Sequence, residues 1–205
     1  MTTLESLKTQ INSVISLYSN GQMQEALDSV ETLIKDYPNE PLLYNVGGAC
    51  YAGLGQLDAA VKSYERALDI KPDYAEAHNN LGVTLQGLSQ LDDAVRSLEK
   101  ALDIKPDYAE AHNNLGNAFK DLGQLDTAVK SYEQAIDIKP DFADAHYNLG
   151  SVLKEIGQLD TALKSYEQVL AIKPGYIEAF NNLGSVLEEL GQLDTAVKSY
   201  EKILT

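Results

Sequence analysis

Tryptophan is absent from this chain, cysteine occurs once and phenylalanine three times among 205 residues. The single cysteine, Cys50, excludes an internal disulfide. The small number of large aromatic residues besides tyrosine indicates a thin, layered core. No apolar run approaches the ~20 residues of a membrane-spanning helix, and the first residues lack the basic-then-apolar layout of a secretory signal. These absences predict a soluble, cytoplasmic protein.

Basic residues are also scarce, since 16 Lys and Arg oppose 31 Asp and Glu for a net charge of −15. A surface potential of this sign repels nucleic-acid phosphates and anionic lipid headgroups. The composition therefore predicts no nucleic-acid partner and no membrane partner. A neutral or basic polypeptide suits this field better.

A repeat of 34 residues organises the whole sequence. The string AEAHNNLG begins at Ala75 and again at Ala109, and related strings begin at Ala143 and Ile177. The sequence GQLDTAV and its variants recur in step with them. The predicted repeats are 7–40, 41–74, 75–108, 109–142, 143–176 and a shortened 177–205. The place of a residue is its position within its repeat, counted from the first residue of that repeat.

Each repeat reads as two helices. Apolar or small residues recur at places 4, 7, 8 and 11, the spacing of one helical stripe, and the second half of the repeat has the same pattern. Glycine at place 15 separates the halves, and proline at place 32 ends the second helix. Asp107 precedes Glu110 by three residues, which predicts a capping box for the next helix. Helix-turn-helix repeats are thus expected throughout.

These features resemble the tetratricopeptide repeat (TPR) family. In the second repeat the characteristic places are occupied by Tyr44, Gly48, Tyr51, Ala60, Tyr64, Ala67 and Pro72. Gly47 departs from the pattern, because leucine is expected at its place. The resemblance covers about the whole chain and implies an all-α, right-handed α-solenoid of six repeats, forming a single domain over 1–205. It further implies that the first helices line a concave groove that binds other polypeptides.

Asparagine is concentrated on the face of the first helices opposite the packing stripe. Place 6 is Asn80, Asn114, Asn148 and Asn182 in four successive repeats. An amide donates and accepts hydrogen bonds together, which matches the backbone of an extended peptide. This series is similar to the superhelical repeat domain of O-GlcNAc transferase, which implies main-chain recognition of a peptide; solubility and local bonding are the alternative explanation. The predicted peptide-binding residues are Asn79, Asn80, Asn113, Asn114, Asn117, Lys120, Tyr147, Asn148, Lys154, Asn181 and Asn182.

Catalytic, metal and cofactor sites are not expected. His78, His112 and His146 recur at 34-residue intervals, too far apart on stacked repeats to share one metal ion, and are interpreted as packing residues. Phosphate-binding loops and paired catalytic carboxylates are missing as sequence patterns. The chain is therefore predicted not to be an enzyme and to have no cofactor.

Three functions remain open at this point. The first is a scaffold that binds an extended, neutral or basic peptide in the groove. The second is the recognition segment of a larger glycosyltransferase or sulfotransferase, because the sequence stops within the last helix of the array. The third is self-association through that helix. Its predicted contact residues are Leu193, Ala196, Val197, Tyr200 and Leu204.

Overall fold

The computed structural model describes residues 3–202, with side chains described from Leu7 onward. Within that range the chain forms twelve α-helices and no strand. The first helices of the six repeats are α1 (Thr3–Ser19), α3 (Pro41–Gly53), α5 (Ala75–Gly87), α7 (Ala109–Asp121), α9 (Ala143–Glu155) and α11 (Ile177–Glu189). The second helices are α2 (Met23–Asp36), α4 (Leu57–Ile70), α6 (Leu91–Ile104), α8 (Leu125–Ile138), α10 (Leu159–Ile172) and α12 (Leu193–Glu201).

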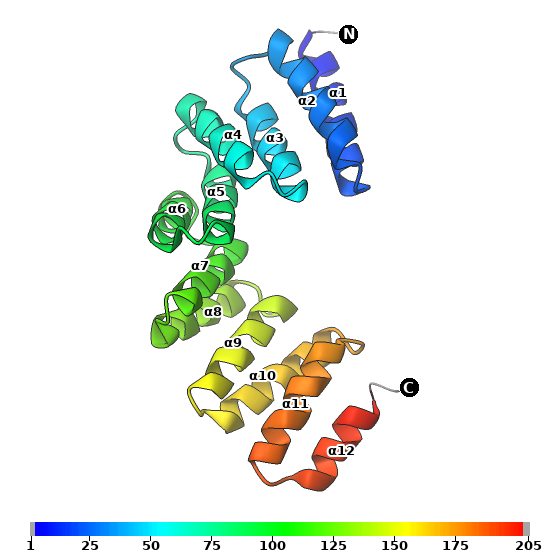
Figure 1. Ribbon diagram of the computed structural model, residues 1–205, viewed down its shortest axis with the longest axis vertical. Coiled ribbons are helices and arrows are strands. Elements are labelled where there is room, and N and C mark those ends of the chain that lie inside the picture. The colour runs from blue at the N-terminus through cyan, green and yellow to red at the C-terminus, as the bar shows by residue number, and fades with distance from the viewer. Residues whose placement is uncertain (1–2, 203–205) are drawn as a thin grey trace. The chain divides into compact units, whose positions relative to one another are not determined.

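The helices, which are labelled in Figure 1, form two compact units. The boundary between these units along the sequence lies between Pro106 and Asp107. The first unit contains α1 to α6 and the second contains α7 to α12. Inside each unit a first helix packs against the second helix of its own repeat and against the second helix of the preceding repeat. Neighbouring first helices also contact one another, as α3 with α5 and α7 with α9. None of the described helices is both long enough and apolar enough to cross a membrane.

Glycine at place 8 lets the two helices of a repeat approach closely. A Cβ atom placed on Gly116 would lie 2.5 Å from Cε1 of Tyr132, and one on Gly184 would lie 2.5 Å from the ring of Tyr200. Alanines at places 20 and 27, such as Ala128 and Ala135, are fully buried at the same contact. Small residues on one helix thus make room for a large ring on the other, which is how a chain without tryptophan fills its core.

A left-handed residue at place 15 reverses the chain between the two helices. Glycine fills this place in five repeats, for example Gly123 at φ +73° and Gly157 at +78°. The third repeat has Ser89 there, at φ +59°. Because only glycine adopts this conformation without a steric penalty from Cβ, the turn after α5 is strained relative to its equivalents.

We expect Ser89→Gly to raise the free energy of unfolding by about 0.5–1 kcal/mol, since it removes that strain and Ser89 is exposed. Urea unfolding followed by circular dichroism measures the change. The reciprocal change, Gly123→Ser, should lower stability by a similar amount. Equal stability of all three proteins would contradict this account of the turn.

The predicted capping box at Asp107 and Glu110 is wrong. Helix α7 begins at Ala109, its N-cap residue is Tyr108, and no side chain caps it. Asp107 therefore lies one residue too early in the turn to serve as the cap. Glu110 instead forms an ion pair with Lys139, 3.3 Å away, at the next turn between repeats.

Candidate functional site

The amides at places 5 and 6 of the first helices are hydrogen-bonded from one repeat to the next. Asn148 Nδ2 donates to Asn113 Oδ1 at 3.0 Å. In the other unit, Asn80 Nδ2 donates to Asn45 Oδ1 at 3.2 Å. In each case the place 6 side chain of one repeat donates to the place 5 side chain of the repeat before it. The predicted series of separate amides is thus a series of bonded pairs.

Tyr147 replaces asparagine at place 5 and preserves the pairing, because Asn182 Nδ2 donates to its hydroxyl oxygen at 3.0 Å. The half-buried Tyr147 ring also lies between two other rings. Its centroid is 5.9 Å from that of Tyr166, in an edge-on arrangement, and 5.3 Å from that of Tyr176. These contacts fix the phenol and therefore the direction in which the Asn182 amide points.

Asn79 and Asn113 are not open to a ligand in the way their helical position predicts. Their exposed fractions are 6% and 7%. The position of Asn113 explains why: α9 packs on α7 and covers place 5, a contact that a single helical wheel does not include. Asn181 occupies the same place on α11, where no further described first helix packs, and it is exposed. Place 5 mainly joins neighbouring repeats.

The Asn148–Asn113 and Asn182–Tyr147 pairs nevertheless leave polar groups free for a ligand. Within the described part of the chain, Asn113 Nδ2 and Asn148 Oδ1 have no other partner, and neither does the Oδ1 of Asn182. No fully buried side-chain nitrogen or oxygen of the described residues lacks a hydrogen bond, so these atoms reach solvent. Place 6 is partly exposed in all four repeats, at Asn80, Asn114, Asn148 and Asn182.

The two predicted lysines of this face differ in their surroundings. Lys154 Nζ donates to Ser185 Oγ at 2.7 Å and lies 3.4 Å from a carboxylate oxygen of Glu189. Lys120 has no hydrogen-bonded or charged partner among the residues that the structure describes, and it is partly exposed. Lys120 is therefore the more available cation of the two.

Asn117, at place 9, serves the core as well as the surface. Its Oδ1 accepts a hydrogen bond from the Tyr132 hydroxyl at 2.8 Å. Burial, with a smaller contribution from Asp121, raises the pKa of Tyr132 well above its usual range, so the phenol remains a donor. Of the predicted residues, Asn117 thus has the clearest structural role.

Two of the acidic residues at place 2 of the first helices are paired at the turns between repeats. Glu110 pairs with Lys139 at 3.3 Å, and Asp144 pairs with Lys173 at 3.0 Å. The hydrogen bond to Asp144 raises the pKa of Lys173. These side chains are about half exposed, so the pairs stabilise little, but they reduce the negative charge available to a ligand.

The histidines at place 4 hold the turn that precedes their own helix. His78 Nε2 lies 2.9 Å from the carbonyl oxygen of Pro72, and His146 Nε2 lies 2.9 Å from that of Pro140. Tyr44 occupies place 4 of the second repeat, and its hydroxyl donates to the carbonyl oxygen of Pro38 at 3.0 Å. Among residues 3–202 no three metal-binding side chains lie close enough to hold an ion.

The predicted self-association residues divide between two faces of α12. Leu193 and Val197 are 62% and 54% exposed. Ala196 is 1% exposed, so its inclusion in an open patch is wrong, and Tyr200 packs against Gly184 of α11. Ala196 is at place 20 and Tyr200 at place 24, and both places face the first helix of the same repeat. The two side chains therefore pack against α11 instead of facing outward. Leu204 lies outside the described residues, and self-association stays a prediction.

Sequence reasoning missed Asn45, which accepts from Asn80 and is 8% exposed. Its place in the repeat was a usable signal, because Asn45 occupies place 5 of the second repeat, and Asn79 and Asn113 occupy place 5 of the next two repeats. Ser185, which binds Lys154, carries no comparable signal. Its contact depends on how far a lysine reaches across two helices.

The paired helices with polar first-helix faces define an α-helical repeat protein. A family model for the TPR repeat matches residues 47–89, 88–123, 116–157 and 150–191. The chain therefore belongs to the TPR family, and the predicted all-α repeat fold is confirmed. Proteins of this family generally bind proteins or peptides.

Solved structures agree with this assignment. The crystal structure of MamA is 33% identical to this chain, covering 77% of this chain and 92% of that chain with a TM-score of 0.71. PilW, a widely conserved type IV pilus biogenesis factor, is 22% identical over 100% of both chains, with a TM-score of 0.86. YrrB, a TPR protein with an unusual peptide-binding site, is 22% identical over 85% of this chain and 90% of that chain, with a TM-score of 0.67. A search of the curated proteins gave no match.

Proposed function

We propose that this protein is a non-enzymatic scaffold that binds an extended polypeptide along the place 6 faces of its first helices. The observation that carries the proposal is the pairing of Asn148 with Asn113, which fixes both amides and leaves one acceptor and one donor free. An extended peptide backbone presents a donor and an acceptor at each residue, so fixed amides bind it without reading its side chains. The resemblance to the repeat domain of O-GlcNAc transferase implies the same main-chain recognition.

Fixed amides also lower the cost of binding. A free asparagine side chain must lose rotamer freedom when it binds a ligand. Asn148 and Asn182 are already held by hydrogen bonds to the preceding repeat, at 3.0 Å in both cases. A larger part of the interaction free energy with the peptide therefore contributes to affinity.

Charge favours a neutral or basic peptide. The chain carries a net charge of −15. Glu76 and Glu178 are exposed at place 2 and have no ion-pair partner among the described residues. Basic side chains projecting from a bound peptide can reach such carboxylates, whereas an acidic peptide meets a repulsive field.

We expect Asn148→Ala to weaken peptide binding about 10-fold, which corresponds to about 1.4 kcal/mol. The change removes the free Oδ1 of Asn148 and releases Asn113 from its fixed orientation. The measurement uses an array of peptides of random sequence to find binders, followed by titration of the best binders in solution.

Asn39→Ala is the matched control, because Asn39 is exposed in the turn between α2 and α3. Thermal unfolding of each variant establishes that it is folded. If folded Asn148→Ala binds within about twofold of wild type, the main-chain recognition proposed here is wrong.

A further inference from the structure

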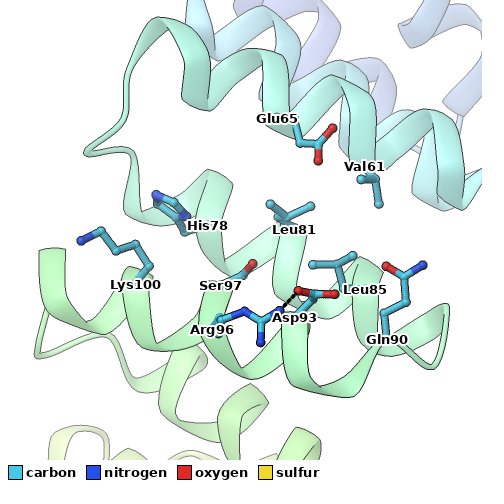
Figure 2. Close-up of a pocket in the computed structure, with 10 residues that line it drawn as sticks. All are labelled: Val61, Glu65, His78, Leu81, Leu85, Gln90, Asp93, Arg96, Ser97 and Lys100. Atoms are coloured by element: carbon cyan, nitrogen blue, oxygen red, sulfur yellow. Dashed lines mark hydrogen bonds and ion pairs between the residues drawn. The ribbon is translucent and has the colours of Figure 1, made fainter.

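Grooves also lie on another part of the molecule, between successive second helices. One of them lies between α4 and α6, has a volume of about 480 Å³ and has α5 as its floor (Figure 2). Equivalent grooves occur between α2 and α4, at about 300 Å³, between α8 and α10, at about 220 Å³, and between α10 and α12, at about 680 Å³. Asn80 does not line the α4–α6 groove, so the groove is separate from the place 6 face.

The same side-chain chemistry recurs in these grooves at the same places of the repeat. One wall carries glutamate at place 25, as Glu65 on α4, and the floor on α5 carries His78 beside two leucines. The other wall carries a basic residue at place 22 and serine at place 23, as Arg96 and Ser97 on α6. The corresponding residues are Glu31, Lys62 and Ser63 between α2 and α4, and Glu133, Lys164 and Ser165 between α8 and α10.

Two apolar leucines form the floor of the α4–α6 groove. Leu81 and Leu85 of α5 face into it, and Val61 of α4 borders it (Figure 2). Each leucine is 7% exposed, so a small part of its surface meets solvent at the bottom of the groove. An inserted apolar side chain would cover that surface.

Opposite charges face each other above this floor. Glu65 makes no hydrogen bond or ion pair with any described residue. Arg96 pairs with Asp93, and Lys100 lies 3.7 Å from Asp103, but all four side chains are more than half exposed. Exposed ion pairs of this kind contribute little to stability, so Arg96 and Lys100 can exchange their present partners for a carboxylate of a ligand.

The neighbouring grooves are less available. Between α2 and α4, Glu31 accepts a hydrogen bond from Tyr51 at 2.8 Å, and the guanidinium carbon of Arg66 lies 5.8 Å from the centre of the Tyr44 ring. Between α8 and α10, Gln168 takes the place of Lys100 and the groove has less than half the volume. Between α10 and α12, Lys198 and Lys202 oppose Glu167, but Lys202 Nζ lies 5.8 Å from the centre of the Phe180 ring. In the α4–α6 groove two basic side chains oppose an unpartnered glutamate, and neither of them lies over a described ring.

We propose that the α4–α6 groove is a second docking site, for a short segment of another protein. The segment inserts one apolar side chain over Leu81 and Leu85. It pairs an acidic side chain with Arg96 and Lys100 and a basic one with Glu65. The groove walls contain two acidic and two basic residues, Glu65 and Asp93 against Arg96 and Lys100, so they balance locally within a chain of net charge −15. An acidic side chain is therefore accepted here although the chain as a whole is strongly acidic.

The test starts from a displayed library of random peptides selected on the wild-type protein. Selected peptides are titrated against wild type, the double variant Arg96→Glu with Lys100→Glu, and Asn80→Ala. We expect a class of peptides with an apolar residue near an acidic one. Their affinity should fall at least about 10-fold on charge reversal and stay unchanged in Asn80→Ala. Replacing the acidic residue of the peptide by lysine should restore binding to the reversed groove.

Lys164→Glu, in the smaller α8–α10 groove, is the matched control and should bind these peptides like wild type. The substituted side chains are exposed, and thermal unfolding verifies that each variant folds. Binding that survives charge reversal, or that is not restored by the reciprocal change in the peptide, overturns the proposal. Peptides that lose affinity only in Asn80→Ala also overturn it, while supporting the place 6 face. Sedimentation that shows a wild-type dimer dissociated by the reversal identifies a second copy as the occupant and likewise overturns it.

Discussion

Tyr132→Ala should lower the free energy of unfolding by about 3–5 kcal/mol, the range for truncation of a large buried aromatic side chain. Tyr132 has no exposed surface and belongs to the core cluster of the second unit. Its ring packs directly on Gly116, where no side chain can move in to fill the space. The Asn117 Oδ1 also loses the donor that lies 2.8 Å from it.

Urea unfolding followed by circular dichroism measures this loss, and Tyr132→Phe separates its two parts. The phenylalanine variant keeps the ring and loses only the hydroxyl, so it should cost about 1 kcal/mol. A loss below about 1 kcal/mol for Tyr132→Ala would show that the second unit repacks around the cavity.

Gly116→Ala is expected to destabilise the protein by about 1–2 kcal/mol although alanine is the better helix former. The new Cβ would lie 2.5 Å from Cε1 and 2.7 Å from Cδ1 of the buried Tyr132 ring. Overpacking of this kind costs about 1–3 kcal/mol, and the gain in helix propensity offsets up to about 1 kcal/mol of it. Urea unfolding provides the measurement.

Two other glycines provide matched controls. At Gly150 the nearest ring atom is 3.0 Å from the added Cβ, so Gly150→Ala should cost less. At Gly87 the nearest atom is Leu57 Cδ1 at 3.3 Å, at the end of a flexible side chain, so Gly87→Ala should leave stability unchanged or slightly higher.

A double-mutant cycle tests the cause. In a Tyr132→Ala background the ring is gone, and Gly116→Ala should then be neutral or stabilising. If the two substitutions are additive, the cost at Gly116 comes from another contact.

The fold was predictable because the sequence repeats its local signals. The start assigned to the fourth repeat at Ala109 is also the first residue of α7, and glycine at place 15 marks the turn between helices. Each signal depends on residues close together in the chain. Six copies in one register make an accidental pattern very improbable.

The candidate site was less predictable because it depends on contacts between repeats. A helical wheel of α7 places Asn113 on the open side, yet α9 covers it. The partners of Lys154 and Glu110 come from α11 and from the turn after α8. The α4–α6 groove needs three helices together, so the residue pattern of one helix alone does not reveal it.

The pairing between places 6 and 5 has a consequence for how such a chain can change its length. In the described pairs every repeat gives a donor to the repeat before it, and Asn113 and Tyr147 show that amide and phenol acceptors are interchangeable. Between the first and second repeats the pair is apolar instead. Ile11 is at place 5 of the first repeat, Val46 is at place 6 of the second, and both belong to the same core cluster. Whole repeats from the amide-bearing part can therefore be duplicated or deleted by recombination without leaving an unmatched polar group at the new joint.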